Sequence, residues 1–314
     1  MATESEESPL NEGWTYFDRI SRAAAGIGVL DFYAQRYQHS SRQVWQQRIE
    51  AGLIRLDGQS TTGATPLHPG QLLSYARPPW REPPAPVQFA LTHSDGDLVA
   101  VAKPAGLPVL PGGQFLSRTL LHLVRRRFGA RLSPLHRLGR GTSGLVLFAA
   151  SPRARQALSH EFRTGSIRKT YRALVEGTGM PETFAVEVPI GRVPYQPVGY
   201  LYAASDAGVP ARSECRVCWQ DSAAGRTLLE VVIPTGRPHQ IRIHLAAAGY
   251  PLIGDPLYVA GGTPRPATGG RAALPGDCGY HLHAQRLGFR HPASGGWHEL
   301  YCRAPSSLRW REGE

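Results

Sequence analysis

The chain has 314 residues, of which 41% are hydrophobic, so it can form one large domain and a small one, and global disorder is excluded. Its 35 Lys and Arg against 24 Asp and Glu give a formal net charge of +11, which favours a polyanionic partner. No apolar run approaches the roughly 20 residues needed to cross a bilayer, so we expect no membrane contact.

The N-terminal quarter predicts a small separate unit. Residues 1–18 are polar and acidic, and they predict a disordered tail in place of a secretion signal. Within residues 19–76, apolar spacing predicts a helix over 19–37. A second helix begins near a Ser N-cap and ends at Gly52. Short strands joined through an Asp57-Gly58 turn follow. With Arg42 and Arg48 among its basic residues, this unit predicts an RNA-binding module.

A linker and a larger domain follow. Five prolines in residues 77–88 predict an extended spacer. Over residues 89–314, strands and helices alternate irregularly, which predicts an α+β domain around a mixed or mostly antiparallel sheet. The expected strands are 98–104, 145–151 and 167–177, the expected helices are 116–129 and 151–165, and residues 227–249 run from a strand through a turn into a helix. Residues 260–279 are rich in Gly and Pro and predict a mobile surface loop.

The four cysteines predict neither a disulfide framework nor a metal site. A chain of this length with so few cysteines fits a reducing compartment, so we expect the cytoplasm. Cys215 and Cys218 form a C-x-x-C, but their surroundings favour a strand, on which positions three apart face opposite sides. Two structural thiols are therefore the preferred interpretation.

The segment HRLGRGTSG, residues 136–144, allows two interpretations. Gly139, Gly141 and Gly144 spell G-x-G-x-x-G, the phosphate loop of dinucleotide-binding proteins. That loop needs a helix to open at its last glycine, because the helix N-terminus binds the pyrophosphate. The apolar, β-rich run LVLFAA follows instead. We therefore disfavour a nucleotide cofactor, and a strand directly after Gly144 would eliminate it.

The same segment resembles the central motif of the RluA-like pseudouridine synthases, H-R-L-D-x-x-T-S-G followed by an apolar strand. Four further segments resemble that family in the same order along the chain: LVAVAKPAGLPVLPG, RKTYRALVEG, TGRPHQIRIHLAAAGYPLIGDPLY and LHAQRLGFRHPASG. The N-terminal unit resembles the alpha-L RNA-binding domain that many members carry. The resemblance covers residues 19–305, and five ordered segments make it far more specific than one motif.

The resemblance implies a fold, a reaction and a set of roles. The fold would be the pseudouridine synthase catalytic domain, and the reaction would isomerise uridine in structured RNA, rRNA or tRNA, without a cofactor and commonly as a monomer. Arg137 would fill the space left by the flipped base. Tyr171 would stack on the uracil, and Arg237 would pair with the catalytic carboxylate. The remaining expected RNA contacts are His136, Arg140, His239 and Arg242.

One departure from the family concerns the chemistry itself. The family's nucleophile is the Asp of H-R-L-D, and this chain has Gly139 there. An unpaired Arg237 would need a new partner, which could be an RNA phosphate, water, or an acid such as Asp255, Glu161, Asp95 or Asp97. Two hypotheses follow: an active pseudouridine synthase, or a catalytically inactive RNA-binding protein on the same fold, acting as a chaperone or assembly factor.

An arginine cluster precedes this motif and predicts a phosphate-binding surface. Arg125, Arg126 and Arg127 end the helix expected over residues 116–129, and Arg131 follows shortly after it. If these side chains meet RNA phosphates, the affinity for RNA should fall steeply with salt concentration. The alternative for any one of them is a solvated arginine at a helix end.

Overall fold

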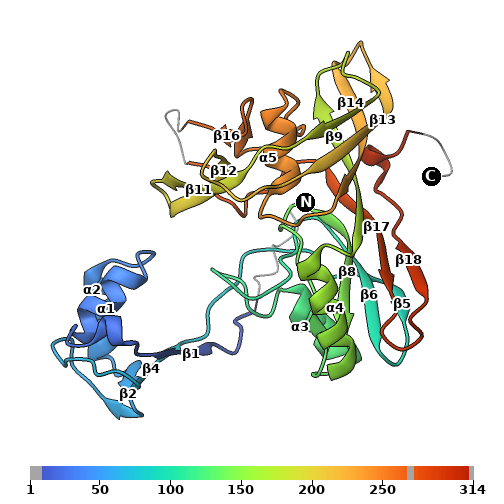
Figure 1. Ribbon diagram of the computed structural model, residues 1–314. Coiled ribbons are helices and arrows are strands. Elements are labelled where there is room, and N and C mark those ends of the chain that lie inside the picture. The colour runs from blue at the N-terminus through green and yellow to red at the C-terminus, as the bar shows by residue number, and fades with distance from the viewer. Residues whose placement is uncertain (1–8, 267–271, 311–314) are drawn as a thin grey trace, which may run out of the picture. The chain divides into compact units, whose positions relative to one another are not determined.

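The computed structural model describes residues 9–266 and 272–310, and the chain divides into two compact units between Pro83 and Pro84. Within the N-terminal unit, α1 (Val29–Arg36) and α2 (Arg42–Glu50) pack on a sheet with the strand order β1-β4-β2-β3 (Figure 1). The strands of this sheet are β1 (Trp14–Arg19), β2 (Ile54–Leu56), β3 (Gln59–Ser60) and β4 (Leu72–Arg77). The aromatic side chains of Tyr33, Trp45 and Tyr75 fill its core.

The structure differs from the sequence expectation at the start of this unit. Residues 14–18, expected in a disordered tail, form most of β1 and pair with β4; residues 1–8 of that tail lie outside the described residues. The helix expected over 19–37 is confined to α1, because Ile20 is tied by backbone hydrogen bonds to Gly70 and Gln71 and a short 3-10 turn, Arg22–Ala24, follows. Helix α2 begins after Ser41, whose hydroxyl accepts from the Val44 N–H, as the N-cap pattern predicts.

The first part of the expected linker packs against the N-terminal unit. The Trp80 N–H donates to Asn11 Oδ1 at 3.1 Å, and Asn11 Nδ2 donates to Glu82 Oε1 at 3.0 Å. The guanidinium of Arg77 stacks over the Trp80 ring at 3.4 Å from its centroid. Residues 77–82 are therefore held to this unit, and the division of the chain follows them.

A mixed sheet organises the second unit (Figure 1). Its strand order is β10-β13-β14-β9-β17-β8-β6-β5, with β18 also paired to β17 and β7 to β8. Neighbouring strands are antiparallel except β8 and β17, which are parallel. The strands are β5 (Ala90–Ser94), β6 (Leu98–Lys103), β7 (Ser133–Pro134), β8 (Ser143–Ala149), β9 (Arg168–Glu176), β10 (Thr183–Val186), β13 (Ser213–Asp221), β14 (Arg226–Ile233), β17 (Leu282–Arg290) and β18 (Trp297–Tyr301). With the helices around it, this sheet confirms the α+β fold class.

Two helices cover opposite faces of the sheet where β6 and β8 pair. Helix α3 (Leu120–Phe128) packs Leu120 and Val124 with the residues of one face, and α4 (Pro152–Thr164) packs Ala154 and Leu158 with those of the other. The alternation of side chains along a strand separates the two clusters. Helix α4 has Pro at its first turn, and it ends at Gly165 in the left-handed region with φ +81°.

Helix α5 (Gln240–Ala247) is buried between the sheet and a hairpin formed by β11 (Ile190–Tyr195) and β12 (Gly199–Ala204) (Figure 1). Ile241 and Leu245 belong to the core cluster on the α3 face of the sheet, whereas Ile243 and Ala246 pack with the hairpin. The short strands β15 (Tyr258–Val259) and β16 (Thr263–Pro264) follow, and Ser306–Leu308 form a 3-10 turn near the C-terminus. The strand–turn–helix predicted over 227–249 is therefore present as β14 and α5.

Strand β8 decides between the two interpretations of residues 136–144. It begins at Ser143, so a strand and not a helix follows the glycines. At Gly144 the backbone has φ +113°, and a Cβ there would lie 2.2 Å from the Ala284 carbonyl oxygen of the parallel strand β17. This glycine permits close pairing of two strands, and the dinucleotide-binding loop is eliminated.

Three further expectations concern cysteines, membranes and the Gly/Pro-rich loop. Cys215 and Cys218 both lie on β13 as free thiols, and within the described residues no three His, Cys, Asp or Glu side chains gather as a metal site would require. None of the described helices is long and apolar enough to cross a bilayer. The loop over 260–279 contains β16, and its residues 267–271 lie outside the described part of the chain.

Candidate active site

A cavity of about 120 Å³ lies on the α3 face of the sheet, between the 136–142 loop, β9, the β14–α5 turn and the residues that precede β17. Polar side chains in its wall include Arg137, Tyr171, Arg237, His239, Arg242 and Tyr280. The sequence-predicted residues among them thus come together from three separate segments of the chain. Tyr280 was not predicted, and no motif pointed to it.

The loop that carries Gly139 is held by buried polar contacts. Lys103, buried at the end of β6, donates to the carbonyl oxygens of Arg140 at 3.1 Å and Leu107 at 2.7 Å. The Gly106 N–H also donates to the Arg140 carbonyl, at 2.8 Å. These bonds connect the K-P-A-G segment to the loop, so two of the five matched segments act as one structural unit. The loop is therefore anchored at the Arg140 carbonyl although it contains Gly139 and Gly141.

His136 is turned into the protein and not toward the cavity. Its Nε2 accepts from the Leu147 N–H at 3.1 Å, and its ring stacks on Phe162 with centroids 4.8 Å apart. Burial lowers the pKa of His136 to about 3, so the ring is neutral, as an acceptor of that bond must be. These contacts give His136 an internal packing role in place of the expected RNA contact.

Tyr280 occupies the space in front of the two loop glycines. A Cβ built on Gly139 would lie 2.8 Å from Tyr280 Oη, and one built on Gly141 would lie 2.8 Å from two carbons of the same ring. Neither glycine has a positive φ, so here the glycines are required by close contact and not by backbone conformation. The phenol also makes a 3.2 Å hydrogen bond with Thr142 Oγ1. The absence of side chains at residues 139 and 141 and the presence of this ring belong together.

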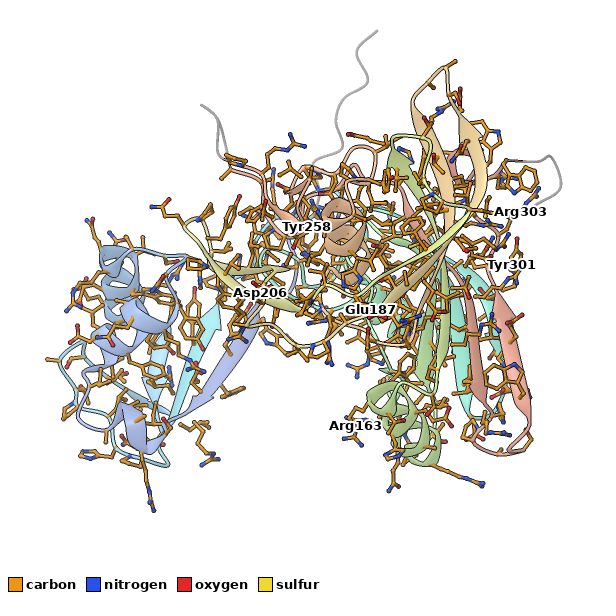
Figure 2. The ribbon with its side chains drawn as sticks, turned by 45° about the horizontal axis from the view of Figure 1, so that its top comes forward. Arg163, Glu187, Asp206, Tyr258, Tyr301 and Arg303 are labelled. Atoms are coloured by element: carbon orange, nitrogen blue, oxygen red, sulfur yellow. The ribbon has the colours of Figure 1, made fainter. Side chains whose placement is uncertain are left out.

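Arg242 provides the buried positive charge of the site. Its Nε and Nη2 donate to the two oxygens of Asp255, both at 2.7 Å, and the side chains are only 3% and 1% exposed. Its guanidinium lies 4.2 Å from the centroid of Tyr280 and 5.0 Å from that of Tyr258. Nη1 is buried without a hydrogen-bond partner among the described residues. Figure 2 shows Tyr258 beside α5.

Arg237 differs from the role expected of it. Its side chain is exposed at the rim of the cavity, where Nε donates to the Pro210 carbonyl at 3.3 Å. An exposed guanidinium carries little desolvation cost, so Arg237 needs no carboxylate partner. The cation that is buried beside the Gly139 loop and paired with an acid is Arg242, five residues further along the same motif.

The acids considered as replacements are engaged elsewhere. Asp255 is bound to Arg242 and also accepts from the Leu257 and Tyr258 N–H groups. Asp95 is paired with His93 and His291, and Asp97 accepts from Ser151. Glu161 lies on α4, on the other face of the sheet. Among the described residues no carboxylate lines the cavity.

His239 presents a neutral acceptor to the cavity. The hydroxyl of Tyr258 donates to the Tyr202 carbonyl at 2.6 Å, so the 2.7 Å contact between His239 Nδ1 and that hydroxyl has the ring N–H as donor. Nε2 then carries no proton. Burial, assisted by Arg242, lowers the pKa of His239 to about 3. Its φ of +56° is rare for a residue with a side chain, and such strain concentrates at functional sites.

Tyr171 lies in the wall of the cavity on β9. It is 9% exposed, and burial raises the pKa of its phenol to about 12, so it is a neutral phenol. Arg137 is exposed and lines the same cavity from the loop. Arg140 stands on the other side of the loop, where Nε donates to the Gly276 carbonyl at 2.7 Å. Arg137 and Tyr171 therefore line the same cavity, and Arg140 is not among the residues that line it.

The remaining predicted RNA contacts lie outside the cavity. At the end of α3, Arg125 donates to the Leu132 carbonyl, and Arg126 and Arg127 border a separate surface hollow. In the N-terminal unit, Arg42 pairs with Asp31, and Arg48 lies 4.3 Å from the centroid of the Trp45 ring. These arginines therefore do not line the cavity, and they lie at other places on the protein.

Comparison with known proteins identifies the family. A family model described as RNA pseudouridylate synthase matches residues 97–247. An uncharacterized RNA pseudouridine synthase of Synechocystis sp. is 50% identical over 264 residues, which cover 84% of this chain and 89% of that protein. RNA pseudouridine synthase 5 of Arabidopsis thaliana is 39% identical over 327 residues, covering 88% and 89% of the two chains. The chain belongs to the RNA pseudouridine synthase family.

A solved structure supports the same fold. Human RNA pseudouridylate synthase domain containing 1 has a TM-score of 0.56 over 72% of this chain and 89% of its own, at 22% identity. The two chains therefore share a fold although few of their residues are identical. The RluA-like resemblance inferred from the sequence is confirmed, and the comparisons give no support to the alternative of an inactive protein.

Proposed function

We propose that this chain is an RNA pseudouridine synthase, which isomerises a uridine of structured RNA, such as rRNA or tRNA, to pseudouridine. One observation carries the proposal: in a chain of this family, Arg137 and Tyr171 line a single cavity although they come from separate segments. In the proposed complex the target uridine leaves the RNA stack, Arg137 fills the vacated space and Tyr171 stacks on the uracil. No step requires a cofactor.

Release of tritium from uracil C5 tests the proposal directly, because forming a carbon–carbon glycosidic bond at C5 expels that hydrogen. The substrate would be total RNA labelled with [5-³H]uridine in cells of the source organism that lack this gene, so that its target uridines are unmodified. We expect tritium release by the purified protein and none by a Tyr171→Ala control. If the Gly139→Asp variant releases tritium and the unmodified protein does not, the result would support the inactive RNA-binding alternative.

We further propose that RNA runs across the end of α3. Leu120 and Val124 of this helix share a core cluster with Tyr171 and Tyr280, so the helix covers the face of the sheet that holds the cavity. Replacing Arg126 and Arg127 by Gln should lower the log–log slope of RNA affinity against salt by about 1 unit for each arginine that meets a phosphate. The matched control is the Gln pair at Arg153 and Arg155, exposed on the opposite face. If the two double variants show the same slope, α3 does not contact RNA phosphates.

The domain assignments stay proposals. We assign RNA binding to the N-terminal unit, supported by exposed basic side chains such as Arg42 and Arg55 on a well-packed scaffold. The synthase reaction is assigned to the second unit, in which the whole cavity lies. Action as a monomer, without a cofactor and in the cytoplasm, also stays a prediction, which size-exclusion chromatography, activity after exhaustive dialysis and cell fractionation would test.

A further inference from the structure

The proposed isomerisation moves one proton, because uridine loses the hydrogen at C5 and pseudouridine carries a new one at N1. A group in the cavity must therefore give a proton to the departing uracil and later accept one. Among the described residues no carboxylate lines the cavity, and its arginines stay protonated at every accessible pH. The side chains that can hold or release a proton there are Tyr171, His239 and Tyr280.

His239 and Tyr171 are poorly suited to donate this proton and accept one later. His239 has its single proton on Nδ1, committed to Tyr258, so it has none to give on the side of the cavity. Tyr171 can give a proton, but burial raises the pKa of its phenol to about 12, and among the described residues no side chain hydrogen-bonds its hydroxyl and no guanidinium stacks on its ring. A buried phenolate without such a partner is costly.

Tyr280 combines a proton with a stabilised conjugate base. Its ring faces the Arg242 guanidinium at 4.2 Å, and its Oη is 3.2 Å from Thr142 Oγ1, which can donate to a phenolate. Burial raises the pKa of Tyr280 above its ordinary value, whereas Arg242 and Thr142 oppose that rise. The resting group is therefore a phenol, and the phenolate that forms after proton donation is held by a cation and a hydroxyl.

The two glycines give the substrate access to this phenol. Because Gly139 and Gly141 have no side chains, Tyr280 Oη comes within 2.8 Å of the position that a Cβ at residue 139 would take. Gly139 itself is exposed, so an incoming ribose and base can approach the loop at this point. The phenol thus lies at the place where the loop meets the substrate.

We propose that Tyr280 is the catalytic acid and base of this enzyme, an inference that rests on the proposed function. The Tyr280 O–H gives its proton to the uracil as the bond between C1′ and N1 breaks, which leaves neutral uracil, a ribosyl cation and a phenolate beside Arg242. The uracil turns, and the C5 carbon bonds to C1′. The phenolate then takes the C5 proton, which restores the phenol and leaves pseudouridine with its proton at N1.

The first test is Tyr280→Phe, which removes the phenol oxygen and keeps the ring in front of the glycines. With C5-tritiated total RNA from cells that lack the gene, we expect kcat to fall at least about 100-fold, the ordinary contribution of acid–base catalysis, with KM unchanged. The matched control is Tyr195→Phe, which also loses one phenol hydrogen bond, to Ala273, but lies outside the cavity. A kcat for Tyr280→Phe equal to that of the control would overturn the inference.

A second variant keeps the hydrogen bond and changes only the acidity. Replacing Tyr280 by 3,5-difluorotyrosine, whose phenol is more acidic, should move the alkaline fall of kcat to lower pH, because the first step needs the protonated form. An unchanged pH profile would overturn the role even if Tyr280→Phe failed to fold. If the unmodified protein releases no tritium, the proposed function itself is refuted. If it releases tritium and the Tyr280 variants release it equally fast, only this inference is refuted.

Discussion

Gly139→Ala tests whether Tyr280 really occupies the space of a side chain at residue 139. The new Cβ would lie 2.8 Å from Tyr280 Oη, at least about 0.6 Å inside ordinary van der Waals contact. Tyr280 is only 5% exposed and packs against Arg242, so its ring cannot withdraw into solvent. Overpacking of this kind costs about 1–3 kcal/mol, and each kcal/mol lowers the melting temperature of a unit of this size by about 2–4 °C.

Scanning calorimetry on four proteins measures this coupling: the unmodified chain, Gly139→Ala, Tyr280→Phe and the double variant. Because Phe lacks the clashing oxygen, the double variant should be more stable than the sum of the two single changes predicts, by about 1 kcal/mol or more. The control is Gly96→Ala, another glycine without a positive φ but with no atom within 4 Å of the added Cβ. Equal costs at Gly96 and Gly139, or strict additivity with Tyr280→Phe, would refute the contact.

The other predictions concern groups held in the interior. Burial holds the pKa of His136 and His239 near 3, below the value near 6.5 of an unfolded chain, so the unfolded state binds the extra protons between these limits. The free energy of unfolding should therefore fall as pH drops below about 6.5, by up to about 1.4 kcal/mol per pH unit for each histidine, and urea unfolding of His239→Gln should show a shallower pH dependence. Asp255→Asn leaves the charge of Arg242 uncompensated, and urea unfolding should show a loss of about 3–5 kcal/mol; a loss under 1 kcal/mol would contradict the pairing. Burial raises the pKa of Cys215 to about 12, so an aromatic disulfide reagent should modify it only after unfolding, and rapid labelling of the native protein would disprove its burial.

The parts of the fold with local signals could be predicted from the sequence. Helix α4 has Ser151 at its N-cap and Gly165 at its end, and both signals lie within the segment itself. Helix α1 was predicted too long at its N-terminal end because the constraint is not local: Ile20 is tied to Gly70 and Gln71, some 50 residues away. The period of apolar residues alone cannot report such a tie.

The same distinction applies to Arg237 and Arg242: the resemblance assigns a carboxylate partner to Arg237, whereas in the fold Arg242 is the arginine that pairs with a carboxylate. Both arginines belong to one motif and are five residues apart, so sequence alone cannot say which of them is buried. Burial of Arg242 depends on α5 being enclosed between the sheet and the β11–β12 hairpin, and its charge is matched by Asp255, 13 residues further along the chain. Those neighbours are distant in sequence, so the motif alone does not distinguish the exposed guanidinium from the buried one.

Tyr280 shows what an aligned motif leaves out. The sequence alone marks Gly139 as a loss, because a family carboxylate is missing there. In the fold, Gly139 and Tyr280, which are 141 residues apart in the chain, share one volume, so a carboxylate could enter at residue 139 only if the phenol moved away. Gly139 and Tyr280 therefore depend on each other: residue 139 brings no side chain, and the Tyr280 phenol, from the segment that precedes β17, occupies that space. Arg242, whose charge is balanced by Asp255, lies over the Tyr280 ring, so the proposed phenolate would form beside a cation that the fold already holds in place.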